Sequence, residues 1–200
     1  MKQAAVEQPG GVVTPAGEQL SVVGQGLLIL SDVLGSAGQR IHANAGRSVD
    51  YEVVKRSNAI LLGGNQSWSG RIFVHQEGFE FHGGIITNKK PLPREQALYR
   101  PGFDPVTGNL SRDYALVLLL PNERRDQRVL LLYSIYTQGM QAAIEFVTNP
   151  ERLTALRRSL MEPAADKKSL QKYFQALLTT TVENYVPDKV SLVSTRAIPE

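Results

Sequence analysis

Two almost uncharged apolar runs, Tyr114–Leu120 and Val129–Ile135, constrain the fold of this chain more than any other feature. Each has the length of a β-strand and is too short to span a membrane. Because an unbroken apolar run is typical of a strand covered on both faces, the two runs predict the interior of a layered sheet. The shorter run Asn58–Leu62 predicts a further buried strand. We expect it and Val129–Ile135 to be central and parallel.

Helical patterns alternate with these runs. The first helix is predicted to begin after Thr14-Pro15 and to end at Gly35, because its apolar residues recur at spacings of three and four: Leu20, Val23, Leu27, Leu30 and Leu34. Ser48 can cap a short helix, Gly139 opens an amphipathic helix, and Asn149-Pro150 begins another. This alternation of helices and strands predicts a parallel sheet covered by helices.

The remaining segments predict turns and hairpins. Phe79–His82 and Ile85–Asn88 flank Gly83-Gly84, which predicts a hairpin. Residues 89–113 hold four prolines and predict a long loop, while Tyr173–Val186 and Val190–Ile198 predict an antiparallel pair that turns at Pro187-Asp188. The predicted fold is therefore a three-layer α/β domain over residues 16–200. It has a mixed, mostly parallel sheet, helices on both faces and a C-terminal antiparallel hairpin. Residues 1–15 have little to bury and predict a flexible tail or linker.

Composition excludes several chemistries. The 200 residues include no cysteine, which excludes disulfides, thiolate nucleophiles and cysteine-based metal sites. The net charge of +3 is dispersed in short clusters, unlike the basic stripe of a nucleic-acid-binding surface. No apolar stretch is long enough for a membrane span, and Met1–Pro15 has no signal-peptide pattern. We therefore expect a cytoplasmic chain without membrane contact.

Two strand-to-loop junctions form the candidate ligand site. In open α/β sheets, ligands bind beyond the carboxyl ends of the strands, where helix N-termini offer N–H groups to anions. If the two junction strands are neighbours, one crevice for a small anion would be lined by Gly63, Gly64, Asn65, Ser67, Trp68, Thr137, Gln138 and Gly139. The alternative is that Gly63-Gly64 only makes a tight turn and that Trp68 is only a packing anchor.

The sequence predicts no catalytic residue, no metal and no cofactor. Neither junction carries a dinucleotide fingerprint or a phosphate-binding loop. Ser67 lacks the glycine spacing of a nucleophile elbow, and the three histidines lack the helical spacing of a metal site. Asp104-Pro105 is most simply a turn. A carboxylate that reached the crevice, such as Glu145 or Asp113, would instead favour an enzyme.

Three segments together resemble a known kind of bacterial domain: Ser48–Gly64, Tyr114–Thr148 and Tyr173–Arg196. The domain they resemble is uncharacterised, occurs in soil-bacterial proteins and often lies downstream of a winged-helix DNA-binding module. The resemblance implies a Rossmann-like fold and a regulatory or sensory role without established enzyme activity.

The chain departs from this pattern at both junctions. The first junction usually reads glycine, a small residue and then Ser-Asn-Pro-Trp, and only Gly63, Asn65 and Trp68 match it. The second usually reads Gly-Thr-Thr and then Gly-Thr, where this chain has Ser134–Thr137 and then Gly139-Met140. These departures place inherited anion binding in doubt.

Three functions follow as expectations. The leading one is a non-enzymatic sensory or interaction domain, a regulatory module of a larger bacterial protein with an upstream DNA-binding partner. The second is an enzyme acting on a phosphorylated or nucleotide-like small molecule. The third is a structural protein that forms a homo-oligomer by pairing through the terminal hairpin.

Overall fold

The structure, a computed structural model, describes residues 5–7, 13–40, 42, 51–63, 78–161 and 172–198. The elements in these ranges are, in chain order, β1 (Ala5–Glu7), β2 (Val13–Pro15), α1 (Ala16–Ser36), α2 (Tyr51–Arg56), β3 (Ala59–Leu62), β4 (Phe79–His82), β5 (Ile85–Asn88), β6 (Leu98–Tyr99), β7 (Gly102–Phe103), β8 (Leu110–Pro121), β9 (Arg128–Ser134), α4 (Thr137–Thr148), α5 (Pro150–Met161), β10 (Tyr173–Glu183) and β11 (Val186–Ile198).

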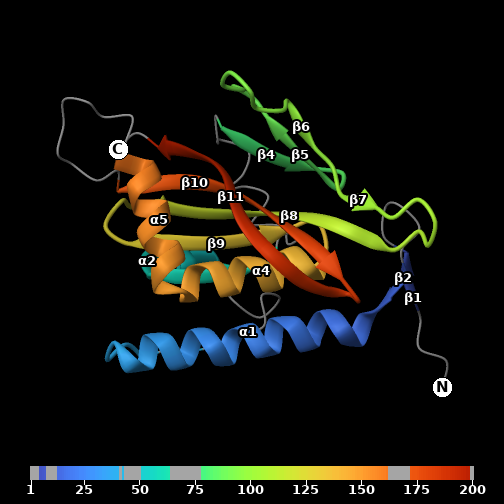
Figure 1. The fold of residues 1–200 in the computed structure, drawn as a ribbon. Coiled ribbons are helices and arrows are strands. Elements are labelled where there is room, and N and C mark those ends of the chain that lie inside the picture. Colours follow the sequence, from blue (N-terminus) through green and yellow to red (C-terminus); the bar gives the residue numbers. More distant parts are fainter. Residues whose placement is uncertain are drawn as a thin grey trace.

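The main sheet has the strand order β11-β10-β8-β9-β3, with β7 paired to β8 (Figure 1). Every pairing in it is antiparallel except that of β3 with β9. The predicted mostly parallel, Rossmann-like sheet is therefore wrong. The physical reason lies between β8 and β9, where Pro121 pairs with Arg128 across a short turn. A parallel connection needs a crossover of about a dozen residues or more. A turn as short as this one can therefore only reverse the direction of the chain.

Part of the predicted topology is confirmed. β3 and β9 are parallel neighbours, with Leu62 opposite Leu132, and β10 and β11 form the expected C-terminal antiparallel hairpin. The central position predicted for β3 is wrong, because this strand ends the described strand order. β8 instead lies in the middle of the sheet, with Leu116 and Leu118 fully buried.

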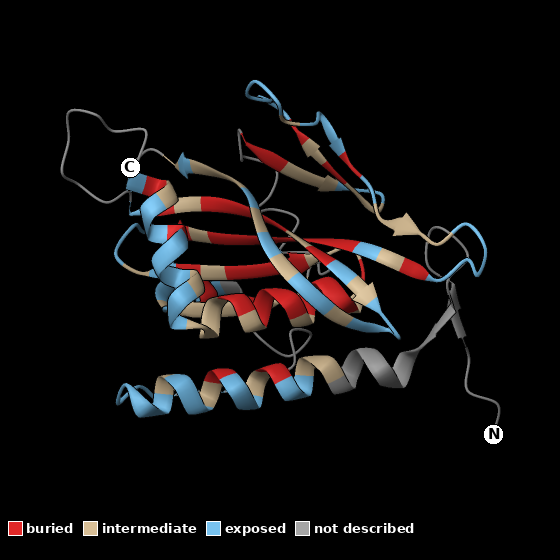
Figure 2. Cartoon of the chain, viewed as in Figure 1, coloured by how far each residue is buried: buried red, intermediate tan, exposed pale blue. Residues whose placement is uncertain are grey.

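Side chains alternate across the main sheet and create two cores. From β8, Ala115 and Val117 face the helices α1, α4 and α5, whereas Leu116 and Leu118 face the opposite side. That opposite side was predicted to carry helices. It is covered by a second sheet, β4-β5-β6, together with Val54 of α2 (Figure 1). Figure 2 shows the buried residues concentrated on the inner strands and α4.

The small sheet contains the predicted hairpin. β4 and β5 pair around Gly83 and Gly84, whose φ values of 58° and 76° favour glycine at both turn positions. The segment predicted as a long loop contains β6, β7 and the start of β8. Phe79, Ile86 and Tyr99, one from each strand of the small sheet, pack into the core between the small sheet and the main sheet.

The terminal hairpin turns at Asn184 and Tyr185, earlier than the predicted Pro187-Asp188. A β-bulge follows in β11, because Leu177 pairs with Ser194 while the next residue, Leu178, pairs with Leu192. Val193 is the additional residue. A single inserted residue reverses the faces of the strand beyond it, so that Leu192 packs with the helix-side core and Arg196 lies over Phe79 on the small-sheet side.

Helix α1 packs on α4 through a glycine. A Cβ at Gly26 would overlap the side chain of Ile144, so the two helices approach closely at this point. The predicted apolar stripe is only partly covered: Leu30 is buried, whereas Leu27 and Leu34 are half-buried. The strands β1 and β2, which precede α1, form an antiparallel pair within the segment that the sequence predicted as a tail.

Candidate functional site

The two predicted junctions meet at one edge of the main sheet. Because β3 and β9 are parallel, their carboxyl ends lie together, and the Gly63 N–H donates a hydrogen bond of 3.0 Å to the Leu132 carbonyl. Gly63 has a φ of +83°, which a residue with a side chain rarely adopts. Gly64, Asn65, Ser67 and Trp68 lie outside the described residues. Of the first junction, the structure therefore places only Gly63.

The second junction is the start of α4. Tyr136 occupies the N-cap position and supplies no side-chain cap, since a phenol cannot fold back on the first helical turn. The first N–H groups of a helix need acceptors from outside the helix. In α4 this acceptor is a side chain of strand β8, because the Gly139 N–H donates a hydrogen bond of 2.6 Å to Oδ2 of the Asp113 carboxylate.

Asp113 lies on β8 and is fully buried. Its Oδ1 accepts a hydrogen bond of 2.8 Å from the Tyr114 N–H, and the Tyr136 N–H lies 3.1 Å from Oδ2. With the bond from Gly139, one carboxylate thus joins β8, the junction after β9 and the first turn of α4. Asp113 fills the position next to a helix N-terminus where an external anion was expected.

The electrostatics of Asp113 combine two opposing effects. Burial raises the pKa of this carboxyl to about 7, against the backbone N–H donors of Tyr114, Gly139 and Tyr136, which lower it. Among the described residues, the hydrogen-bond donors to its carboxylate are backbone amides, so a charge on it is balanced by peptide dipoles. Burial, with the Asp113 charge as a second cause, also raises the pKa of Tyr136.

Gly139 is required by this arrangement. A Cβ at Gly139 would lie 2.6 Å from Asp113 Oδ2, 2.8 Å from the Tyr114 carbonyl oxygen and 2.9 Å from the Ser134 Cβ. The glycine predicted to approach a ligand therefore approaches the chain's own carboxylate and strand.

Thr137 and Gln138 connect the junction to the terminal hairpin. The Thr137 hydroxyl lies 3.1 Å from Gln138 Oε1, and Gln138 Nε2 donates to the Tyr185 carbonyl at 3.2 Å. The Tyr185 hydroxyl donates in turn to Asn109 Oδ1 at 3.0 Å. The structure therefore connects Thr137, Gln138 and Gly139 with Asp113, Tyr185 and Asn109, and it places Gly63 at the carboxyl end of the neighbouring β3. That these residues bind a ligand stays a prediction.

The sequence had singled out Asp113 and Glu145 only as carboxylates that would favour an enzyme by reaching the crevice. Asp113 does reach the junction, but as the cap of α4. Glu145 is half-buried on α4 and accepts a weak hydrogen bond of 3.4 Å from Gln141. The available sequence signal was a carboxylate directly before an apolar run, a position where a buried carboxylate is found only when it is hydrogen-bonded.

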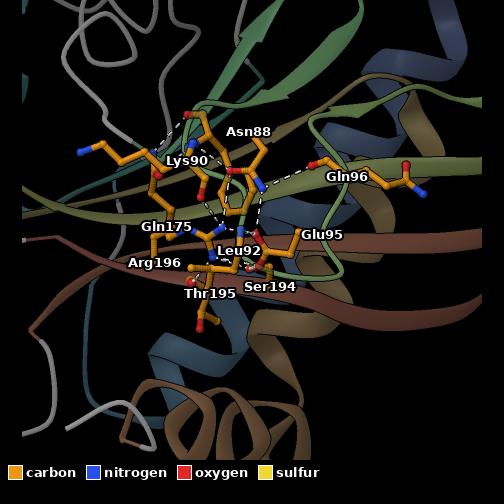
Figure 3. Close-up of polar contacts among 10 residues, drawn as sticks. Asn88, Lys90, Leu92, Glu95, Gln96, Gln175, Ser194, Thr195 and Arg196 are labelled. Carbon is orange, nitrogen blue, oxygen red and sulfur yellow. Dashed lines mark hydrogen bonds and ion pairs between the residues drawn. The ribbon is translucent and has the colours of Figure 1, made fainter.

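A second polar cluster joins the two sheets (Figure 3). Arg196 of β11 forms an ion pair with Glu95 and lies over the Phe79 ring, 5.0 Å from its centroid. Glu95 also accepts hydrogen bonds from the Ser194 hydroxyl at 2.5 Å, the Asn88 amide at 2.9 Å and the Leu92 N–H at 2.9 Å.

The cluster is unsuited to acid–base catalysis. Although burial opposes it, hydrogen bonding from Arg196, Ser194, Leu92 and Asn88 lowers the pKa of Glu95 to about 2. A carboxylate with so low a pKa is a poor base for the Ser194 hydroxyl. We therefore assign the Glu95–Arg196 cluster a structural role, holding the loop before β6 against β11.

The residues that the structure describes contain no group of three or more side chains suited to hold a metal ion. None of the described helices has the length and apolar character that a membrane span requires. A shallow surface hollow on α5 is lined by Thr154, Arg157, Arg158 and Met161, none of which belongs to the predicted site.

Comparison of the chain with protein-family models, curated proteins and solved structures gives no match.

Proposed function

We propose that this chain is a non-catalytic regulatory domain that acts through contacts with other macromolecules, as a module of a larger bacterial protein. The observation that carries the proposal is the closure of the α4 N-terminus by Asp113. The N–H group that could bind a small anion there already donates to an anion of the same chain.

The bonding of Asp113 also argues against a catalytic base at this junction. A general base needs a lone pair within reach of the substrate proton. Asp113 is inaccessible to solvent, and both of its oxygens accept backbone hydrogen bonds. Its contacts fit a residue that organises the junction better than one that turns over a substrate.

Exposed apolar side chains support macromolecular contacts. Leu28 on α1 is 73% exposed, and Tyr185 and Val186 at the tip of the terminal hairpin are 64% and 52% exposed. Exposed aromatic and aliphatic groups on ordered elements are common at protein interfaces. The resemblance to a domain found after winged-helix modules suggests an upstream DNA-binding module as the partner.

The alternative of assembly through the terminal hairpin is less favoured. β11 ends the strand order of the main sheet, but it carries Pro187, Lys189 and the bulge at Val193. Proline, lysine and bulges are the features by which edge strands avoid pairing with another chain.

A chemical-rescue experiment tests the proposal. Asp113→Ala removes the carboxylate and frees the amide donors of Tyr114, Tyr136 and Gly139. We expect the variant to be destabilised, and to regain thermal stability in formate more than in an equal concentration of chloride. Wild-type protein should shift by less than about 1 °C with formate, phosphate, ADP or NAD, because its donors are already bonded.

Asp126→Ala is the matched control, since Asp126 is exposed in the β8–β9 turn, and it should show no preference for formate. A clear stabilisation of wild-type protein by a nucleotide would contradict the proposal. So would hydrolysis of p-nitrophenyl phosphate by wild-type protein that Asp113→Ala abolishes.

A further inference from the structure

Two groups of arginines that lie apart in the sequence are found at the same end of the main sheet. Arg124, Arg125 and Arg128 are exposed in and beside the turn between β8 and β9. α4 begins beyond the other end of β9 and packs back along the sheet, so α5, which follows it, starts near this turn (Figure 1). α5 carries the exposed Arg157 and Arg158. We call these five residues the basic end.

The carboxylates of the turn have partners other than these arginines. Glu123 forms an ion pair of 3.1 Å with Lys55 of α2, and Asp126 accepts a hydrogen bond of 2.7 Å from the Asn122 amide. In the described part of the chain, no carboxylate forms an ion pair with an arginine of the basic end. The positive charge of the basic end is therefore open to an external anion.

Hydrogen bonds hold the turn that presents three of these arginines. Asn122 Oδ1 accepts from the Asp126 N–H at 3.1 Å, and Asn122 Nδ2 donates to the Lys55 carbonyl at 2.8 Å. The Arg128 N–H donates to Asn58 Oδ1 at 2.9 Å, which ties the start of β9 to the residue before β3. Because the turn is already ordered, binding through it does not carry the entropy cost of ordering a loop.

The side chains at this end favour a phosphate backbone over a membrane surface. Guanidinium groups bind phosphate oxygens in a bidentate manner. Membrane binding grows with the apolar area that enters the lipid, but residues 122–128 are all polar or charged. α5 adds Leu153 and Met161, which are only 41% and 44% exposed.

The same side chains favour a duplex over a single strand. Proteins that bind single strands stack the bases on aromatic rings. The exposed ring of Tyr185 lies at the other end of the main sheet, in the turn between β10 and β11. The backbone of a duplex is the polyanion that exposed arginines bind without such rings.

We propose that the basic end binds the phosphate backbone of double-stranded DNA without reading its sequence. Neutralising several phosphates of a duplex releases condensed counterions, and this release drives the binding. Free phosphate has no such counterion atmosphere, so it should still leave the thermal stability of the protein unchanged.

The inference rests on the proposed function, because it names DNA as a macromolecule that this regulatory module contacts. The two can fail separately. The formate and turnover measurements concern Asp113 at one end of β9, whereas DNA binding concerns the arginines at the other end.

Fluorescence anisotropy with a labelled DNA duplex of about 20 base pairs tests the proposal. We expect a Kd of about 10⁻⁶–10⁻⁴ M at physiological salt, and a log Kd that rises with log salt concentration with a slope of about 4 for four or five phosphates. Arg124→Gln with Arg125→Gln should lower this slope by about 2 and weaken binding by about tenfold or more, and so should Arg157→Gln with Arg158→Gln.

The matched control is Arg100→Gln with Arg112→Gln, which removes the same charge elsewhere. Both arginines are exposed, and Arg112 lies near the start of β8, at the opposite end of that strand from the turn. This control should bind the duplex as wild-type protein does. All three double variants should unfold at the wild-type temperature, since the replaced side chains are exposed.

Three results would overturn the proposal. An equal loss of binding in the control would show that net charge, not the basic end, attracts the duplex. A slope near zero would exclude phosphate contacts. Sedimentation with phosphatidylglycerol vesicles at a salt concentration where the duplex does not bind would assign the basic end to an anionic membrane.

Discussion

The side chain of Gln175 forms the two backbone hydrogen bonds with Phe79 that a neighbouring strand would otherwise form. Its carboxamide oxygen accepts a hydrogen bond of 2.9 Å from the Phe79 N–H, and its amide group donates to the Phe79 carbonyl at 3.3 Å. Both residues are buried, and they belong to different sheets. The small sheet is therefore joined to the main sheet by a side chain that pairs as a backbone does.

Replacing Gln175 by leucine should destabilise the protein severely. Leucine keeps most of the volume but leaves the buried N–H and C=O of Phe79 without partners. Unsatisfied buried groups of this kind cost about 1–3 kcal/mol each, so we expect a loss of about 2–4 kcal/mol in urea unfolding. Gln141→Leu, which removes only a weak bond to Glu145, should cost less than about 0.5 kcal/mol. Equal losses in both variants would contradict the role of Gln175.

The bulge at Val193 leads to a second prediction. Deleting Val193 would restore regular pairing between β10 and β11. Arg196 would then point away from Glu95, into the apolar core between the main sheet and the helices. A separated buried ion pair costs about 3–5 kcal/mol, so the deletion should prevent stable folding or lower stability by at least that amount. Val193→Ala keeps the register and should cost less than about 1 kcal/mol, because Val193 is 37% exposed. A deletion variant as stable as Val193→Ala would show that the bulge does not direct Arg196.

Strand positions could be predicted from the sequence better than strand directions. The apolar runs that form β8 and β9 are buried on both faces, as predicted. Burial on both faces is compatible with parallel and with antiparallel pairing, so it does not determine strand direction. The decisive feature was the short turn at Asn122, whose side chain accepts hydrogen bonds from the Asp126 and Gln127 N–H groups. Turn geometry was also readable at Asp104, whose carboxylate accepts from the Val106 and Thr107 N–H groups, as expected for an Asp-Pro turn.

The candidate site was predictable only in part. The parallel pairing of β3 and β9 brings Gly63 to the same edge as α4, as expected. The capping of α4 by Asp113 could not be read locally, because capping rules concern the residue next to the helix, and Asp113 precedes Tyr136 by 23 positions. Tertiary structure alone brings the two together. Whether the described part of this edge binds a ligand stays a prediction.

Two glycines of α1 provide a matched pair of variants. A Cβ at Gly24 would have nothing within 4 Å, so Gly24→Ala should stabilise the protein by about 0.5–1 kcal/mol through helix propensity alone. Gly26→Ala gains the same propensity but overlaps Ile144, and should therefore be less stable than Gly24→Ala. Combining Gly26→Ala with Ile144→Val should recover part of the difference, which thermal unfolding of the four proteins would measure. Equal stabilisation by both alanines would show that α1 does not pack closely on α4.

The dependence of stability on pH should have two limbs of opposite sign. The pKa of Glu95 is about 2 in the folded protein, below its ordinary value of 4.5. Its contribution is therefore fully present above about pH 4.5 and is lost as the pH falls toward 2. The shift corresponds to at most about 3 kcal/mol, since the side chain is 14% exposed and Arg196 is its partner. Glu95→Gln should flatten this acid limb.

Asp113 should produce the other limb. Its pKa of about 7 in the folded protein lies above its ordinary value of 3.8, so the folded state binds this proton more tightly than the unfolded state does. The resulting stability is fully present below about pH 4 and is lost as the pH rises through 7. Urea unfolding should therefore give the highest stability near pH 4–5, and Asp113→Asn should flatten the decline between about pH 5 and pH 8 while leaving the acid limb in place. A wild-type stability that rises steadily from pH 5 to pH 8 would mean that the amide donors of Tyr114, Tyr136 and Gly139 outweigh burial, so that Asp113 stays ionised throughout.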